Sequence, residues 1–118
     1  MDELVFLVTM PDGEERRGFA FRGRVIAGRH ETSDLQLPHP NVSRRHAEFS
    51  LRSDGSILIR DLGSSNGTTV GRTLLTGDEI SVAGDVDVSI GPYKIHVSVS
   101  SDSSRATMVD NKARSSPR

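Results

Sequence analysis

The sequence predicts an all-β domain, an antiparallel β-sandwich of two twisted sheets. Apolar and polar residues alternate in many short runs, for example at residues 4–8 and 93–99, and this period of two is typical of half-buried strands. Turn-forming residues separate the runs, and no segment sustains the 3.6-residue period of a helix. Short strands joined by frequent turns indicate an antiparallel sandwich or barrel, and in a sandwich the loops gather at one end.

The expected strands follow one another along the chain as apolar runs at residues 4–8, 19–21, 25–27, 57–62, 80–82, 86–90 and 93–99, with a further strand that begins at Ala47. Turn signals lie between them, and these are Pro11-Asp12-Gly13, Arg22-Gly23, Asp54-Gly55, Asn66-Gly67, Val70-Gly71, Thr76-Gly77, Gly84-Asp85 and Gly91-Pro92. Glycine adopts the positive φ angles that such tight turns need, and Asn or Asp beside it favours the same geometry.

One folded domain and a tail are expected from the composition. The chain has 118 residues, which is enough for a single hydrophobic core. Residues 1–99 carry 11 basic and 14 acidic side chains, whereas the Ser-rich residues 100–118 carry 4 basic and 2 acidic ones. Because this last segment has almost no large apolar side chain, it cannot offset its ordering entropy by burial. We expect a domain at 1–99 and a disordered tail or linker at 100–118.

Several classes of protein are disfavoured. The sequence has no cysteine, so a disulfide framework and a thiolate zinc site are absent. No stretch resembles a signal peptide or approaches the ~20 apolar residues of a membrane span. We therefore expect a cytoplasmic or otherwise intracellular protein with no membrane partner. No metal and no cofactor are expected either. The acidic balance of residues 1–99 also disfavours nucleic acid, although Arg44-Arg45 and the basic tail leave it open.

Three clusters in turn-like sequence carry the chemistry of an anion site. They are Gly28-Arg29, Ser43-Arg44-Arg45-His46 and Ser64-Ser65-Asn66-Gly67-Thr68. An arginine fork binds a phosphate through two parallel hydrogen bonds and stays charged at any working pH. Turns of glycine and serine bring backbone N–H groups close to an anion. Because sandwich loops gather at one end, the clusters are predicted to meet there and bind a phosphate.

The order and spacing of these clusters resemble the forkhead-associated (FHA) domain. Asp61-Leu62-Gly63-Ser64-Ser65 ahead of Asn66-Gly67 and Gly77-Asp78-Glu79-Ile80 behind it add to the resemblance, which runs from about Leu4 to Val99. The resemblance implies a β-sandwich whose loops at one end bind phosphothreonine peptides. It also implies that the domain has no catalytic activity, so the protein is not expected to be an enzyme.

The resemblance also implies which residues touch the ligand. Arg29 would be the main phosphate ligand. Ser43 would give its hydroxyl to another phosphate oxygen, and Arg44 would add a further phosphate contact. Asn66 would bind the peptide backbone beside the phosphothreonine, and Ser65 would support the same loop.

Three more residues would shape the loops, again by resemblance. Gly28 and Gly67 would allow backbone conformations and close approaches that a Cβ forbids. His46 would tie the loops together from beneath.

Other sites remain to be weighed against this one. Ser43, His46 and Asp61 are the residue types of a hydrolase, but the Gly-x-Ser-x-Gly turn that exposes a nucleophile is absent. His30, His39 and His46 lack the spacing and carboxylate support of a metal site. Nucleotide-binding glycine motifs are absent as well. The main alternative is a structural or protein-interaction scaffold whose phosphate pocket is not used.

The expected partner is a phosphothreonine-containing protein or peptide, together with the Ser/Thr protein kinase or its substrates. The tail itself offers Thr107, with Asp110 three positions later, and the preferences of FHA domains include an acidic residue there. The stretch from Ser100 to Thr107 reaches at most about 25 Å when fully extended. The resemblance implies that the chain termini lie at the end of the sandwich away from the binding loops, and a strand of seven residues is itself about 23 Å long. If phosphorylated Thr107 is bound at all, we therefore expect it to be bound in trans, by another molecule.

Overall fold

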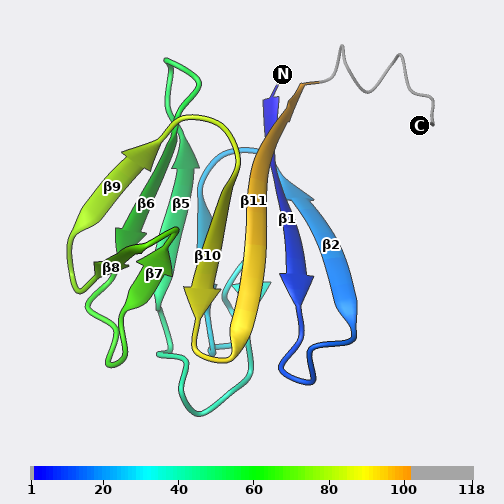
Figure 1. Ribbon diagram of the computed structural model, residues 1–118, viewed down its shortest axis with the longest axis vertical. Coiled ribbons are helices and arrows are strands. Elements are labelled where there is room, and N and C mark those ends of the chain that lie inside the picture. Colours follow the sequence, from blue (N-terminus) through cyan, green and yellow to red (C-terminus); the bar gives the residue numbers. More distant parts are fainter. Residues whose placement is uncertain (1, 102–118) are drawn as a thin grey trace.

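A computed structural model describes residues 2–101 of the chain, which form eleven strands joined by loops and turns (Figure 1). The strands are β1 (Asp2–Thr9), β2 (Arg16–Phe21), β3 (Val25–Gly28), β4 (Leu35–Gln36), β5 (Ala47–Leu51), β6 (Ile57–Asp61), β7 (Thr68–Val70), β8 (Thr73–Leu75), β9 (Glu79–Val82), β10 (Val86–Ile90) and β11 (Tyr93–Ser101). Within the described residues, there is no helix long and apolar enough to cross a bilayer.

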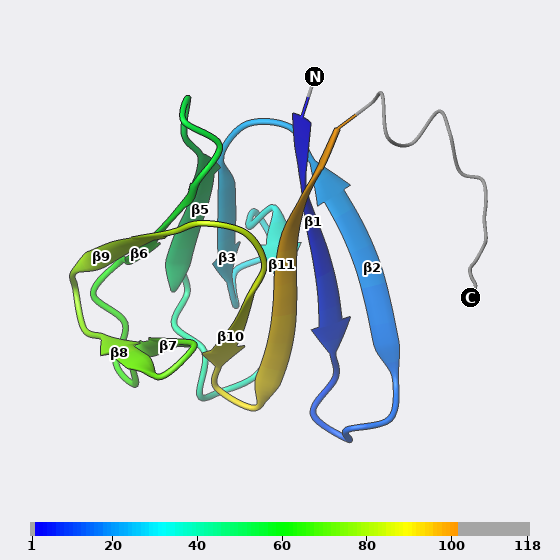
Figure 2. The same cartoon turned by 45° about the horizontal axis from the view of Figure 1, so that its top comes forward.

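The strands form two sheets that face each other. One sheet has six strands in the order β2-β1-β11-β10-β7-β8, and the other has five in the order β4-β3-β5-β6-β9. Neighbouring strands run antiparallel except β3 and β4, which are parallel. The predicted antiparallel β-sandwich is confirmed, and Figure 2 shows the two layers from a second direction.

Alternation along the strands explains how the layers pack. Leu4, Phe6 and Val8 of β1 are at most 1% exposed, and Phe49 of β5 is fully buried. The rings of Phe6 and Phe49 meet edge to face with centroids 5.1 Å apart, and so join the two sheets. Burial of one such side chain stabilises the fold by about 1.5–3 kcal/mol. The core thus fixes the strands whose ends carry the loops.

The loops of interest lie at one end of the sandwich. Figure 1 shows the segment between β3 and β5 and the turn between β6 and β7 at this loop end, whereas β1 begins and β11 ends at the opposite end. Strand β11 continues beyond the expected domain boundary at Val99, because Ser100 and Ser101 pair with Glu3 and Asp2 of β1. Most of the expected tail, Thr107 included, lies outside the described residues.

Candidate functional site

Arg29 directly follows β3, and the loop opposite holds its side chain. Its backbone N–H donates to the carbonyl oxygen of Ser43 at 2.9 Å, and its Nε–H donates to the carbonyl oxygen of Val42 at 2.9 Å. Within residues 2–101, neither terminal nitrogen of the guanidinium has a partner. The side chain is therefore fixed in direction, while the exposed end of its fork can receive a ligand.

Gly28 is needed because two loop segments touch at this position. A Cβ there would lie 2.1 Å from the carbonyl oxygen of Arg44 and 2.8 Å from its carbonyl carbon. The close approach lets the N–H of His30 reach the carbonyl of Arg44 at 3.3 Å, and the N–H of His46 reach the carbonyl of Ala27 at 2.9 Å. The segment after β3 is thus fastened along the segment before β5.

His46 is fully buried and connects three loop segments. Its Nδ1 accepts the backbone N–H of Ser43 at 3.0 Å, and its Nε2 lies 2.8 Å from the carbonyl oxygen of Gly67. Since the first partner is a donor and the second an acceptor, the ring is the neutral tautomer with its hydrogen on Nε2. The carbonyl of His46 also accepts the N–H of Leu62 at 2.9 Å. His46 therefore holds the loops from beneath.

This position gives a testable division between stability and binding. We expect His46→Ala to lower the free energy of unfolding by about 1–3 kcal/mol, because the Ser43 N–H and the Gly67 carbonyl lose their partner. Binding of a phosphate-containing ligand by these loops should weaken as a consequence. Ser43→Ala should weaken binding with little change in stability. Urea denaturation of both variants makes the comparison, and a His46→Ala variant as stable as the parent would refute the division.

Two polar side chains in the loops are oriented by contacts between the loops. The N–H of Ser65 donates to Oγ of Ser43 at 3.0 Å, which leaves the Ser43 hydroxyl hydrogen available to a ligand. Nδ2 of Asn66 donates to the carbonyl of Asn41 at 2.9 Å, which leaves its Oδ1 as an acceptor. Ser65 thus acts through its backbone, and its own side chain is exposed.

Asp61 at the end of β6 organises the loop that carries these residues. It is 2% exposed. Its oxygens accept the hydroxyls of Ser64 at 2.6 Å and Thr68 at 2.7 Å, and the N–H groups of Gly63, Ser64 and Gly77 at 3.1, 3.0 and 2.8 Å. Burial alone would raise the pKa of Asp61, but the hydrogen bonds from Ser64, Thr68 and Gly77 outweigh it and lower the pKa below its usual value.

From the sequence, Asp61 was a candidate only for a hydrolase. The sequence nevertheless contains a signal for the structural role of Asp61, because an Asp followed within a few residues by Gly and Ser typically accepts hydrogen bonds within its own turn. Gly67 in the same loop has a φ of +82°, and a Cβ there would lie 2.7 Å from Cδ1 of Leu74 and 3.0 Å from the carbonyl oxygen of Leu75. Conformation and space both favour glycine at this position.

These side chains line one cavity of about 320 Å³ at the loop end, which we call the loop-end cavity. Its lining is Arg29, Pro40, Asn41, Val42, Ser43, Arg44, Arg45, Ser65 and Asn66, three arginines and no acidic residue. The structure thus brings the expected ligand residues together around one space. Gly28, His46 and Gly67 are buried, and their contacts join the loops. Pro40, Asn41, Val42 and Arg45 also line the cavity, although none of them was assigned a contact with the ligand from the sequence.

The contacts of His46 and Asp61 also bear on the hydrolase site considered from the sequence, and the placement of the acidic and histidine side chains bears on the metal site. His46 accepts the backbone N–H of Ser43 rather than its hydroxyl, and Asp61 bonds to Ser64 and Thr68 rather than to the imidazole. The hydrogen-bonded chain that a Ser–His–Asp nucleophile needs is therefore not formed by these residues. Among the residues that the structure describes, no group of three or more His, Asp or Glu side chains is placed to hold a metal ion.

Comparison with known families matches residues 25–91, more than half of the chain, with the FHA domain. The protein belongs to the FHA-domain family. A solved structure described as "Structural and functional analysis of phosphothreonine-dependent FHA domain interactions" superimposes on this FHA domain with a TM-score of 0.66. It is 29% identical in sequence, and the match covers 81% of this chain and 95% of that one.

Two bacterial proteins are similar in sequence to part of this chain. The chain is 46% identical over 74 residues to the oxoglutarate dehydrogenase inhibitor of Corynebacterium diphtheriae, a match that covers 63% of this chain and 50% of that protein. It is 44% identical over 69 residues to the glycogen accumulation regulator GarA of Mycolicibacterium smegmatis, with 58% and 42% covered. The matches thus span half or less of the length of these relatives.

Proposed function

We propose that this FHA domain binds phosphothreonine peptides and so joins the protein to partners that a Ser/Thr kinase has phosphorylated. The observation that carries the proposal is the arrangement of Arg29, Ser43 and Arg44 around one cavity whose lining contains no acidic residue. A phosphothreonine carries nearly two negative charges at pH 7 and presents three acceptor oxygens. Cations and hydroxyl donors without a competing carboxylate match that chemistry.

Each residue has a separate part in the proposed complex. The two terminal nitrogens of Arg29 bind phosphate oxygens, and the anchor from Nε to Val42 reduces the entropy lost on binding. The hydroxyl of Ser43 donates to another oxygen, and the exposed guanidinium of Arg44 adds positive charge. Oδ1 of Asn66 accepts a backbone N–H of the peptide beside the phosphothreonine.

A regulatory role without catalysis follows from this mode of binding. The two curated relatives are named an inhibitor and a regulator, and the family match covers the loops that build the cavity. We propose phosphorylation-dependent recruitment as the activity of this chain, with the unused-pocket scaffold as its alternative.

The experiment uses three immobilised degenerate peptide libraries that differ only at the central residue, which is phosphothreonine, threonine or glutamate. We expect the protein to be retained on the phosphothreonine library alone, since a glutamate offers one charge and two acceptor oxygens where the phosphate offers more of both. Equal retention on the phosphothreonine and threonine libraries would favour the scaffold alternative.

The pH dependence provides a second prediction, with the strongest phosphopeptide from that library as ligand. The second ionisation of the phosphate lies near pH ~6. Affinity measured by calorimetry should rise from about pH 5 to about pH 7.5, because the dianion makes stronger charge-assisted hydrogen bonds with Arg29 and Ser43. A sulfothreonine peptide is the control, since its sulfate keeps one charge over this range and its affinity should stay level. The same rise for both peptides would show that a protein group is titrating instead.

The tail threonine gives a third prediction, although Thr107 lies outside the described residues. The six residues that follow Ser101, up to Thr107, reach at most about 22 Å, whereas the nine-residue β11 that leads away from the loop end is about 30 Å long. We propose that phosphorylated Thr107 binds the cavity of a second molecule. Light scattering of the phosphorylated protein should show concentration-dependent association that Arg29→Ala abolishes. A monomer that nevertheless resists added phosphopeptide would contradict binding in trans.

A further inference from the structure

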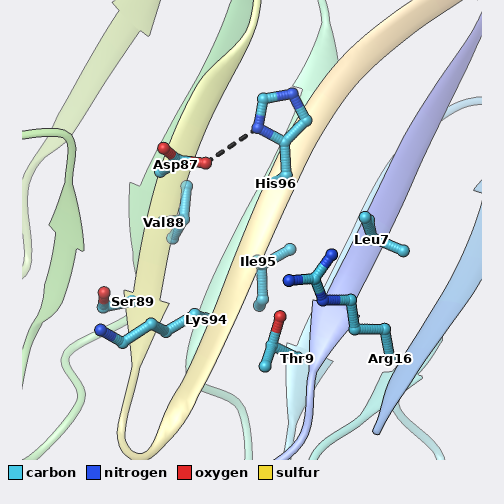
Figure 3. Close-up of a pocket in the computed structure, with 9 residues that line it drawn as sticks. All are labelled: Leu7, Thr9, Arg16, Asp87, Val88, Ser89, Lys94, Ile95 and His96. Carbon is cyan, nitrogen blue, oxygen red and sulfur yellow. Dashed lines mark hydrogen bonds and ion pairs between the residues drawn. The ribbon is translucent and has the colours of Figure 1, made fainter. Parts of the chain in front are cut away.

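A groove of about 410 Å³ crosses the outer face of the six-stranded sheet, on the side away from the core (Figure 3). Cross-strand neighbours form two rows along it. One row is Arg16, Thr9, Lys94 and Ser89, and the next is Leu7, His96 and Asp87. We call this surface the outer groove. It spans β2, β1, β11 and β10, and the loop-end cavity involves none of its residues.

The unpaired charge of the outer groove is positive. Asp87 accepts from Nδ1 of His96 at 2.8 Å, and Asp85 lies 3.4 Å from Nε2 of the same ring. In contrast, Arg16 and Lys94 have no ion-pair partner within residues 2–101. They lie two strands apart in one row, so their backbones are about 10 Å apart. The groove therefore presents two cations without an ion-pair partner among the described residues, and its carboxylate, Asp87, is hydrogen-bonded to His96.

An apolar side chain lies open beside these cations. Leu7 is 41% exposed, although most large apolar residues of the sheet are buried. Its neighbour on β2 is Gly18, which has no side chain to cover it. An aliphatic side chain of a ligand can therefore pack on Leu7 while its acidic neighbours meet the cations.

The turn between β10 and β11 lies between the outer groove and the loop-end cavity. A Cβ on Gly91 in that turn would lie 3.1 Å from Cγ2 of Val42 and 3.6 Å from the carbonyl oxygen of Asn41, so the turn packs against the lining of the cavity. Ser89 and Lys94 pair just beyond this turn. The outer groove thus begins two or three residues, about 7–10 Å, from the wall of the cavity.

We propose that the outer groove binds an acidic, extended segment of the same partner that places its phosphothreonine in the loop-end cavity. The inference rests on the function proposed above. Carboxylates two or four positions apart on one side of an extended segment are about 7 or 14 Å apart, which brackets the spacing of Arg16 and Lys94. Because the phosphothreonine already tethers the partner, even weak contacts in the groove raise the affinity.

The test uses as its core peptide the phosphothreonine peptide that binds most strongly in the library experiment. Longer peptides carry about eight additional residues before or after the core. In the Glu form these residues alternate between Glu and Leu, and in the matched Gln form they alternate between Gln and Leu. For one of the two extensions, either before or after the core, we expect the Glu form to bind about threefold to tenfold more tightly than the matched Gln form. In amide NMR spectra of isotope-labelled protein, the Glu form should shift Leu7, Lys94 and His96.

Charge-reversal variants test whether the groove is the source of the tighter binding of the Glu form relative to the Gln form, which we call the gain. Arg16→Glu and Lys94→Glu should each reduce the gain while binding of the short core changes little. Arg52→Glu is the matched control, because Arg52 is exposed beyond β5 at the opposite end of the sandwich and makes the same change of charge. It should keep the gain.

The outcomes separate this proposal from the function on which it rests. A core peptide that shifts Arg29 and Ser43, together with equal affinities of the Glu and Gln forms and unshifted groove amides, would overturn the outer groove and leave phosphothreonine binding intact. If the Glu forms shift groove amides but no peptide shifts the loop residues, the groove binds acidic segments without a phosphothreonine, and the proposal of a shared partner is wrong. If no peptide shifts either region, both proposals fall.

Discussion

Arg29→Ala is expected to weaken binding of a phosphothreonine peptide by at least about tenfold, which corresponds to about 1.4 kcal/mol. A charge-assisted hydrogen bond contributes about 1.5–3 kcal/mol, and its removal leaves phosphate charge unmatched in the cavity. The fold should persist, because the side chain is exposed and gives the protein only its Nε–H contact with Val42. Calorimetry measures the affinity, and thermal unfolding checks the fold.

Two further variants isolate the geometry of the Arg29 fork from its charge. Arg29→Lys should recover only part of the affinity, because an ammonium is a point charge and cannot bind two oxygens in parallel. Arg52→Ala removes an equal charge far from the loop end and should bind like the parent. Unchanged affinity of Arg29→Ala with a normal unfolding transition would remove Arg29 from the site.

Asp61→Ala is expected to lower the free energy of unfolding by about 3–4 kcal/mol at neutral pH. The substitution leaves two hydroxyls and three backbone N–H groups without their acceptor around a site that is 2% exposed. Binding should weaken too, since the loop of Ser64 to Thr68 loses its anchor. Urea denaturation measures the effect, and Asp54→Ala is the control, because Asp54 accepts from Ser56 in an exposed turn and should matter little.

The low pKa of Asp61 also fixes the direction of a pH effect. The folded-state pKa lies below the unfolded value of about 3.9, so the stabilisation is fully present above about pH 4 and is lost as the pH falls through the folded pKa. The parent should therefore lose stability in this acidic range. Asp61→Asn should be less stable at neutral pH and lose less on acidification. An equal acid-induced loss in both proteins would show that Asp61 does not carry it.

The sequence predicted the sandwich and the meeting of the loops because both depend on local signals. Alternation marks the strands around Phe6 and Phe49, and turn residues mark their ends. The contacts that shape the cavity depend on pairs far apart in the sequence. The approach of Gly28 to Arg44, the carbonyl of Val42 that holds Arg29, and the bonds from Asp61 to Gly77 exist only once the sheets have packed.

Two of the strand pairings could not be predicted from local patterns for the same reason. Strand β4 joins the sheet in parallel beside β3, and β7 pairs with β10 rather than with β6, its neighbour in sequence. Neither pairing follows from a hairpin turn. The outer groove likewise arises from the register that aligns Arg16 with Thr9 and Thr9 with Lys94.

The central claim is that the loop-end cavity receives the phosphate of a phosphothreonine, and amide NMR of the isotope-labelled protein tests it most directly. The strongest phosphopeptide from the library is added first, and the unphosphorylated form of the same peptide is the control. We expect saturable shifts at Arg29, Ser43, Ser65 and Asn66 with the phosphopeptide and none with the control. Shifts confined to other faces of the sandwich, or equal shifts with both peptides, would contradict it.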